Sequence, residues 1–296
     1  MILAVTGGSG SLGRAILEEQ ERLASHGIKK IRILSRDEQK QVYITRNYKG
    51  SIPLDCYLAD VSDKERMSFA LNDANYVIHA AAQKHIEKFE LDVKTGYKTN
   101  IHGTENVAQG FLHSKEGRRA LFVSTDKAAV PITAYGVSKL AAEHIWCWHN
   151  SFQKQKKFLF TRSGNVFGSR GSVIETWTAL SKRGAPLPIT DPSCTRFFMT
   201  IKETAEFVIH TLFFSNEEKN IPSCKGTKML RLAEIIWKHW NPEKPFEFKD
   251  VGYRSIEKQH EILLESGQSS NEVEQFTDKE LKALYENWLS QERIML

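Results

Sequence analysis

Residues 2–13, which read ILAVTGGSGSLG, decide the fold. Ile2–Thr6 favours a β-strand, glycines follow at positions 7, 10 and 13, and a helical pattern begins at Arg14. Glycine after a strand allows a turn with positive φ and lets backbone N–H groups approach a phosphate. The N-terminus of the next helix adds a further attraction for negative charge. The G-x-x-G-x-x-G spacing between strand and helix therefore predicts a dinucleotide site rather than a plain tight turn.

Short β-rich runs alternate with helical patterns through the first half of the chain. Nearly continuous apolar character favours strands that are buried on both faces, as in a parallel sheet. The expected strands are Ile2–Thr6, Ile31–Ser35, Leu54–Leu58, Tyr76–Ala80, Leu121–Ser124 and Phe158–Thr161, and the expected helices are Arg14–Ser25, one opened by a capping box at Ser62–Glu65, Thr99–Phe111 and Ala134–Phe152. This alternation predicts an α/β fold with a doubly wound parallel sheet.

Glycines and prolines interrupt the chain after about residue 165, where loops replace the alternation. Helical patterns return at Glu203–Phe214 and Leu230–Trp240, and a capping box at Thr277–Glu280 opens a last amphipathic helix. We therefore expect a dinucleotide-binding domain over residues 1–165, with residues 195–215 packing back on it. Residues 166–194 and 216–296 are expected to form a smaller C-terminal substrate-binding lobe.

The composition excludes several classes of protein. The 296 residues are 41% hydrophobic with 18 glycines, which argues against wholesale disorder. The net charge of +5 is too small to indicate nucleic-acid binding, although it suits an anionic ligand. The four cysteines lie far apart, so neither a metal site nor a disulfide framework is expected, and reduced thiols indicate a cytoplasmic chain. We expect no signal peptide and no membrane span.

The end of the second expected strand distinguishes NADP from NAD. Sheets that bind NAD usually place Asp or Glu there for the ribose 2′-hydroxyl. Here Ser35 and Arg36 end the strand, and a cation at this point suits the 2′-phosphate of NADP. Asp37 is also able to bind a ribose, so NAD stays the alternative. After the third strand, Asp60 with Val61 is interpreted either as an adenine contact or, for Asp60, as a local cap.

Tyr135 and Lys139 form a Y-x-x-x-K pattern within an expected helix. Residues four apart lie on one helix face, where an ammonium group is expected to lower the pKa of the phenol. Such a tyrosine takes a proton from an alcohol while hydride leaves the same carbon. Upstream, Ser124 and Thr125 end a strand at the carboxyl edge of the sheet, where a cofactor would lie. The pattern predicts a site that oxidises an alcohol.

These features together resemble the short-chain dehydrogenase/reductase superfamily of extended type, which implies a Rossmann fold. Ser124–Ala129, followed by Pro131, Tyr135 and Lys139, is similar to the active-site run of the inverting UDP-N-acetylglucosamine 4,6-dehydratases. Other stretches resemble that family in chain order over roughly residues 1–264: Ser35–Gln41, His79–His85, Lys98–Ile101, Arg162–Val173, Ile189–Asp191, Thr195–Phe197 and Gly252–Glu261.

The resemblance implies an NADP-dependent dehydratase that oxidises C4 of the sugar, eliminates water across C5 and C6 and returns hydride to C6. It implies that Tyr135, supported by Lys139, is the base for the C4 hydroxyl. Asp126 and Lys127, which follow Thr125, would form the elimination pair, with Lys127 as base and Asp126 as acid. Burial favours these protonation states, whereas mutual attraction opposes them, so the division between acid and base stays open.

Two contrasts favour the inverting branch of that family. Dehydratases of the dTDP-glucose type carry Asp-Glu where this chain has Asp126 and Lys127, and the retaining enzymes place Met where Tyr135 stands. A sugar 4-epimerase or ketoreductase is the alternative, but it would need no elimination pair. A non-catalytic dinucleotide sensor is a third possibility, but it would not need an activated phenol.

Arginine forks suit phosphate oxygens, and the resemblance extends to several candidate arginines. The residues expected to contact the UDP-sugar are Lys84, His85, Asn165, Arg170, Ser172, Val173, Thr195, Arg196, Arg254 and Glu257. The residues expected to bind the cofactor are Gly7, Ser9, Gly10, Ser11, Leu12, Gly13, Ser35, Arg36, Asp37, Lys40, Asp60, Val61, Ala80, Ala81, Ala82, Lys84, Asn100, Tyr135 and Lys139. No residue is assigned to a metal.

Two departures from the family's pattern leave the exact sugar open. Val130 stands where the family usually has Asn, and the loop at Arg254 lacks the usual Pro-Gly. Helix Ala134–Phe152 resembles the dimerisation helices of the superfamily, so a homo-oligomer, either a dimer or a hexamer, is expected. No role is assigned to the residues after about 264.

Overall fold

The chain forms two units in a computed structural model that describes residues 1–252 and 255–295. Unit 1 comprises Met1–Arg162 and Lys202–Pro222, and unit 2 comprises Ser163–Ile201 and Ser223–Leu296. The predicted division differs at three places, the first being residues 163–165, which belong to unit 2. Residues 195–201 belong to unit 2, because a strand there pairs with other strands of that unit, and residues 216–222 belong to unit 1, where they extend its sheet.

A parallel sheet of seven strands, in the order β10-β6-β5-β4-β1-β2-β3, forms the centre of unit 1. The strands are β1 Ile2–Thr6, β2 Lys30–Ser35, β3 Leu54–Leu58, β4 Tyr76–His79, β5 Arg119–Thr125, β6 Lys157–Ser163 and β10 Lys219–Asn220. The predicted α/β fold with a doubly wound sheet is confirmed. The strand order reverses between β1 and β4, and open α/β sheets bind ligands at the carboxyl ends of such strands.

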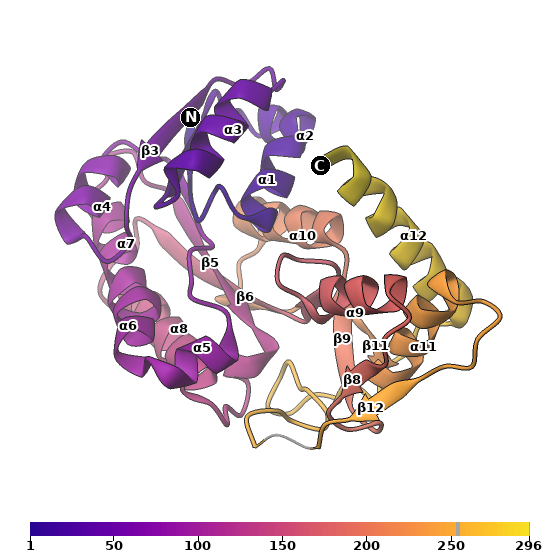
Figure 1. The fold of residues 1–296 in the computed structure, drawn as a ribbon. Coiled ribbons are helices and arrows are strands. Elements are labelled where there is room, and N and C mark those ends of the chain that lie inside the picture. The colour runs from indigo at the N-terminus through magenta and orange to yellow at the C-terminus, as the bar shows by residue number, and fades with distance from the viewer. Residues whose placement is uncertain (253–254, 296) are drawn as a thin grey trace. The chain divides into compact units, whose positions relative to one another are not determined.

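Helices lie on both sides of this sheet (Figure 1). On one side α4, α7 and α8 pack side by side, and on the other α10 packs beside α2, where the rings of His26 and Phe213 stack at 4.1 Å. The helices of unit 1 are α1 Ser11–Glu18, α2 Gln20–Ser25, α3 Glu38–Asn47, α4 Lys64–Leu71, α5 Ile86–Leu91, α6 Val93–Tyr97, α7 Gly103–Leu112, α8 Ala134–Phe152 and α10 Ile201–Phe214.

Large aromatic side chains fill the core of unit 1 against α7 and α8. Trp146 of α8 is fully buried, and its indole N–H donates to the carbonyl oxygen of Leu159 at 2.9 Å. Trp148 is 61% exposed, because residues two apart on a helix do not share a face. This helix has the bounds that the sequence predicts. Its buried face is the one that carries Trp146.

The predicted helices at Arg14–Ser25 and after Ser62 differ from the structure. The helix expected over Arg14–Ser25 is two helices, because the backbone leaves helical geometry at Glu19 with a ψ of 40°. The cap of α4 is Asp63 rather than Ser62, because the carboxylate of Asp63 accepts the N–H of Arg66 at 2.9 Å.

Unit 2 contains two small sheets, ordered β11-β9-β7 and β12-β8, and three helices. Its elements are β7 Asn165–Val166, α9 Val173–Lys182, β8 Leu187–Ile189, β9 Thr195–Met199, β11 Lys225–Lys228, α11 Met229–Trp240, β12 Phe248–Asp250 and α12 Asp278–Met295. Trp177, Trp237 and Tyr285 are buried in its core. The predicted capping box of α12 is confirmed, since Thr277 N–H donates to Glu280 at 2.8 Å and Glu280 N–H donates back to the Thr277 hydroxyl at 3.3 Å.

Candidate active site

The loop after β1 imposes conditions that only glycine meets. Gly7 has a φ of 69°, and a Cβ there would lie 2.8 Å from the backbone N of Ala81. A Cβ at Gly13 would overlap the carbonyl oxygen of Gly8. Helix α1 begins at Ser11 with no side-chain cap on its first N–H groups. The loop therefore brings bare backbone and a helix N-terminus to the carboxyl ends of β1 and β4, and this arrangement fits the phosphates of a dinucleotide.

The other small or apolar residues predicted for the cofactor lie around this loop. They are Ser9, Gly10 and Leu12 in the loop and the first turn of α1, Ala80, Ala81 and Ala82 directly after β4, buried Val61 after β3, and buried Ser35 at the end of β2. The hydroxyl and carbonyl of Ser35 both accept from the side chain of Gln41, at 2.9 and 3.1 Å. Ser35 is thus fixed by α3.

Two cations lie at the end of β2. Arg36 is exposed, and its guanidinium lies 3.4 Å from the carboxylate of Asp60. Asp37 is held locally, because it accepts the N–H of Lys40 at 2.9 Å and pairs with the Lys40 ammonium. Asp60 accepts the N–H of Ser62 at 2.8 Å; burial would raise the pKa of Asp60, but this bond and Arg36 lower it. Both carboxylates therefore have local partners at this edge of the sheet.

A buried histidine, for which sequence reasoning found no role, links the glycine loop to α7. His79 Nδ1 lies 2.6 Å from Thr6 Oγ1, and its Nε2 lies 3.0 Å from Thr104 Oγ1. Burial, helped by the charge of Lys139, lowers the pKa of His79 to about 3. A neutral ring therefore fixes the end of β4, and its partners lie too far along the chain for a local motif to have identified them.

Asn100 lies in a π-helical turn, Lys98–His102, that precedes α7 and replaces the start of the helix predicted over Thr99–Phe111. Its amide donates to the carbonyl oxygen of Gln83 at 3.1 Å and to Ser138 Oγ at 3.1 Å, and its oxygen accepts the Gln83 N–H at 2.8 Å. Asn100 thus contacts α8 between the two residues of the Y-x-x-x-K pattern. Such turns are frequent at functional sites.

Tyr135 and Lys139 are both buried on α8, as their spacing predicts. The prediction that Lys139 lowers the pKa of Tyr135 is wrong. Burial and the charge of Asp126 raise that pKa to about 12, although Lys127 and a hydrogen bond with Thr125 oppose the shift. The Lys139 ammonium instead donates to the carbonyl oxygen of Val123 at 2.8 Å, and burial lowers its pKa to about 7 against the opposing charge of Glu143. Lys139 therefore changes charge near neutral pH.

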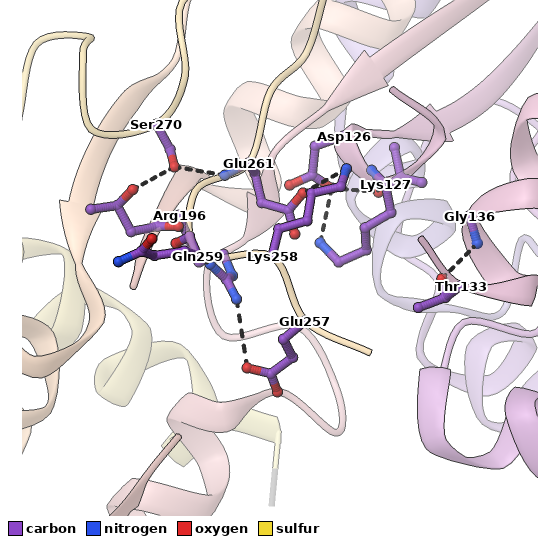
Figure 2. A network of polar contacts seen from close by, with 12 residues as sticks. Asp126, Lys127, Thr133, Gly136, Arg196, Glu257, Lys258, Gln259, Glu261 and Ser270 are labelled. Atoms are coloured by element: carbon purple, nitrogen blue, oxygen red, sulfur yellow. Dashed lines mark hydrogen bonds and ion pairs between the residues drawn. The ribbon is translucent and has the colours of Figure 1, made fainter. Parts of the chain in front are cut away.

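Asp126 and Lys127 form a close pair in a short 3₁₀ turn directly after β5, shown in Figure 2. Lys127 Nζ lies 2.9 Å from Asp126 Oδ1, which also accepts from Thr125 Oγ1 at 2.7 Å. Asp126 is fully buried, and its Oδ2 has no hydrogen-bond partner among the described residues. A buried carboxyl oxygen without a partner gains stability by carrying a proton or by accepting one from a ligand. The turn can therefore serve as a proton donor and acceptor in one place.

A buried ion pair, which the sequence does not reveal, contacts the end of β5, directly before this turn. Glu143 of α8 accepts from Arg162 of β6 at 2.7 to 3.2 Å, and the Ser124 hydroxyl donates to the same carboxylate. Glu143 lies one helical turn beyond Lys139, and its charge opposes the loss of the lysine proton. The three residues tie α8 to β5 and β6. Arg162 belongs to a stretch that carried the family resemblance, but no local spacing connects it with Glu143.

Val130 has a φ of 48°, the one positive value among the described non-glycine residues. This left-handed conformation costs a β-branched residue about 1–3 kcal/mol, whereas Asn tolerates it. The position is therefore one that favours the Asn expected from the family's pattern, and Val130 introduces strain between the 3₁₀ turn and α8.

Several residues predicted to contact the substrate lie in one segment of unit 2. Asn165 is in β7, Arg170 is exposed in the following loop, and Ser172 and Val173 lie where α9 begins. The Ser172 hydroxyl is buried and has no hydrogen-bond partner within the described part of the chain. An open hydroxyl at the start of a helix is suited to an anionic ligand.

A second group of predicted substrate residues is joined by polar contacts in unit 2, drawn in Figure 2. The Arg196 guanidinium donates to the carbonyl oxygens of Thr195 and Gln259 at 2.7 and 3.2 Å and lies 3.6 Å from Glu257. The Thr195 hydroxyl lies 2.6 Å from Ser270 Oγ. These contacts hold the segment around residue 259 against β9. Arg196 therefore stabilises this part of unit 2 independently of any ligand.

The remaining predicted residues are Lys84, His85 and Arg254. Lys84 follows the alanines after β4, and His85 is the N-cap residue of α5 without a side-chain cap bond. Arg254 lies outside the described residues. No group of three or more His, Cys, Asp or Glu side chains arranged to hold a metal ion occurs among the residues that are described. Across residues 1–252 and 255–295, none of the helices combines the length and apolarity needed to span a bilayer.

Comparisons with known proteins agree with this geometry. A family model described as polysaccharide biosynthesis protein matches residues 3–281. The inverting UDP-N-acetylglucosamine 4,6-dehydratase of Campylobacter jejuni (strain 81-176) is 35% identical over 271 residues, which cover 90% of this chain and 78% of the relative. The UDP-glucose 4-epimerase of Rickettsia rickettsii is 34% identical, covering 89% and 77%. The X-ray structure of Pen from Bacillus thuringiensis, 24% identical, has a TM-score of 0.88 over 97% of each chain, and it bears on the fold alone.

Proposed function

The chain belongs to the polysaccharide biosynthesis protein family, and on that premise we propose that it is an NADP-dependent nucleotide-sugar 4,6-dehydratase. The proposed reaction converts UDP-N-acetylglucosamine into a UDP-4-keto-6-deoxy-hexosamine with inversion at C5. The observation that carries the proposal is the Asp126–Lys127 contact of 2.9 Å, in the turn between β5 and the helix that holds Tyr135 and Lys139. An enzyme that only moves hydride at C4 has no use for a second acid–base pair.

Oxidation at C4 needs a base for the hydroxyl proton. Tyr135 accepts this proton, and Thr125 and Lys127 are the neighbours that favour its ionised form. When bound, the nicotinamide supplies the acceptor for the C4 hydride and the donor that later returns hydride to C6. Lys139 and Asn100 position the helix and the nearby backbone through their contacts with Val123 and Gln83. The C4 ketone then acidifies the proton at C5.

The elimination uses the Asp126–Lys127 pair. Transfer of one proton from Lys127 to Asp126 along their hydrogen bond turns an ion pair into a neutral amine and a neutral carboxylic acid. Lys127 then removes the C5 proton, and Asp126 protonates the C6 hydroxyl, which leaves as water. The Oδ2 of Asp126, buried and without a hydrogen-bond partner among the described residues, supports this division, because it is open to a hydrogen bond with the C6 hydroxyl.

Mass spectrometry of the product formed from UDP-N-acetylglucosamine in deuterated water tests the proposal. We expect a nucleotide sugar that has lost one water and carries one deuterium at C5, with no net change in cofactor. Proton NMR of the same sample should report inversion at C5.

A UDP-sugar 4-epimerase is the second candidate, because relatives such as the Rickettsia rickettsii enzyme carry that name. An epimerised sugar of unchanged mass in that experiment would favour it. No change in any UDP- or dTDP-sugar would instead favour a dinucleotide sensor.

The proposed preference for NADP rests on Arg36. Arg36→Ala should weaken NADP binding about 10- to 100-fold, because a hydrogen bond to a charged group contributes roughly 1.5–3 kcal/mol. The affinity for NAD should stay within about threefold. Calorimetric titration with each dinucleotide measures both affinities. Arg46→Ala, which removes an exposed cation from the far end of α3, is the matched control. Equal weakening of NADP and NAD by Arg36→Ala would contradict this selectivity.

The proposal includes a homo-oligomer and a reducing, cytoplasmic setting. Val137, Trp148 and Phe152 of α8 are 45%, 61% and 52% exposed and form one apolar stripe on the helix. Light scattering of the purified protein would test for an oligomer. All four cysteines are free, as is usual for proteins kept under reducing conditions.

A further inference from the structure

Helix α12 contacts the loop that carries several of the proposed substrate residues, and it does so beyond the region matched by the family model, which ends at residue 281. The indole N–H of Trp288 donates to the carbonyl oxygen of Gly168 at 3.1 Å. A Cβ at Gly168 would overlap the same indole ring, and Gly168 has a φ of 65°. The backbone at residue 168 is therefore held against Trp288 by a hydrogen bond and by close packing.

The loop is fixed at both ends, and within it the N–H of Gly171 donates to the carboxylate of Glu175 at 2.7 Å. Phe167 is buried at the start, where its N–H donates to the carbonyl oxygen of Met199 at 2.8 Å, and Ile174 is buried at the end. Between them Gly168 and Gly171 both have positive φ, which lets the chain turn twice within a few residues. The Trp288 contact is thus placed at the first of these turns, two residues before Arg170.

Trp288 is itself fixed by the packing of α12 in unit 2. Its ring stacks on Tyr285 with centroids 5.9 Å apart. Tyr285 is buried, and its hydroxyl accepts from the Trp240 indole at 2.7 Å and lies 2.9 Å from Thr178 Oγ1. The indole is therefore held in place by both α9 and α11, and it can resist movement of the loop.

We propose that Trp288 is a positioning residue that holds the loop of residues 167–172 in the conformation that binds the diphosphate of a nucleotide sugar. The inference rests on the proposed function and on the expectation from the sequence that Arg170 and Ser172 contact the UDP-sugar. The Ser172 hydroxyl, buried and without a partner in the described chain, has the geometry of a donor kept for a ligand. Trp288 does not touch substrate in this scheme and acts through the backbone at Gly168.

Trp288→Phe keeps an aromatic ring at this position but removes the indole N–H donor. We expect the KM for UDP-N-acetylglucosamine and the Kd for UDP to rise about fivefold, the usual effect of one lost hydrogen bond, with kcat within about twofold. Trp237→Phe is the matched control, because it removes a similar indole N–H bond, to the carbonyl oxygen of Pro245 at 2.9 Å, that contacts neither α12 nor Gly168. It should leave KM and Kd within about twofold while lowering stability by a comparable amount.

Amide hydrogen exchange of residues 166–172 gives a readout that does not depend on turnover. It should quicken in Trp288→Phe and stay unchanged in Trp237→Phe. Gly168→Ala, which drives a methyl group into the indole, is the second variant and should raise the Kd for UDP at least as much.

The proposed function and this inference fail in different ways. A wild-type protein that binds UDP but forms no dehydrated sugar refutes the dehydratase, while the Kd for UDP in the variants still decides the role of Trp288. Equal effects of Trp288→Phe and Trp237→Phe on Kd and amide exchange would overturn the positioning role. A wild-type protein that does not bind UDP would overturn it as well.

Discussion

Lys127→Ala is expected to slow dehydration by about 10²- to 10⁴-fold, the range found for general acid–base groups, while oxidation at C4 survives. The reason is that Lys127 is assigned only to the C5 proton, whereas Tyr135 serves the C4 hydroxyl. Stopped-flow absorbance of NADPH should therefore show cofactor reduction that persists, because the hydride has no C6 acceptor. Mass spectrometry of the quenched mixture should find the 4-keto sugar without loss of water.

Asp126→Asn is the matched variant that separates acid from base. If Lys127 is the base, Asp126→Asn should still exchange the C5 proton for deuterium but fail to expel water, and Lys127→Ala should do neither. Thermal melting of both variants is needed, since Lys127→Ala leaves a buried carboxylate that still accepts a hydrogen bond from Thr125 but has lost its neighbouring ammonium group. If Lys127→Ala incorporated deuterium at C5 and Asp126→Asn did not, Asp126 would be the base and Lys127 the acid. Unchanged dehydration in a folded Lys127→Ala would refute the elimination pair.

The fold could be predicted well because its signals are local. Each expected strand of unit 1 from Ile2–Thr6 to Phe158–Thr161 corresponds to a strand of the sheet. A short apolar run between two helical patterns is typical of a buried strand. The short strand β10 escaped prediction because its two residues, Lys219 and Asn220, carry no apolar pattern, and it is defined by its pairing with β6.

The site could be predicted where it depends on spacing and not where it depends on burial. Tyr135 and Lys139 share a buried face because they are four residues apart on one helix. Their pKa values did not follow from that spacing, because burial moves the pKa of Tyr135 up and that of Lys139 down. The Glu143–Arg162 pair joins residues 19 apart in the chain, and only the packing of α8 on β6 brings them together.

Val130 illustrates how a departure from a family's pattern becomes physical once the backbone is known. The sequence marks it only as a valine where an asparagine is usual. The structure adds a φ of 48°, which a valine adopts at a cost and an asparagine adopts readily. The strain lies in the segment between the Asp126–Lys127 turn and Tyr135, so it bears on the region where the proposed chemistry occurs.

Tyr135→Phe is expected to depress both oxidation and dehydration by about 10²- to 10⁴-fold, because the phenol is the proposed acceptor of the first proton. The ring fits the same buried space, so loss of activity would not be confused with loss of packing. Its pKa of about 12 means that little phenolate exists at neutral pH without a partner that favours it. The variant should therefore show neither transient NADPH nor the 4-keto sugar, in contrast to Lys127→Ala.

The control for Tyr135→Phe is Tyr76→Phe, which makes the same chemical change at another buried tyrosine of unit 1, 7% exposed against 6% for Tyr135. Tyr76→Phe should keep kcat within about twofold, since Tyr76 is the first residue of β4 and lies at the opposite end of that strand from the carboxyl edge of the sheet, where ligands bind. Because oxidation precedes elimination, the double variant that combines Tyr135→Phe with Lys127→Ala should behave as Tyr135→Phe does alone. Full activity in Tyr135→Phe would refute oxidation at C4 by this residue, and with it the order of steps on which the elimination by Asp126 and Lys127 depends.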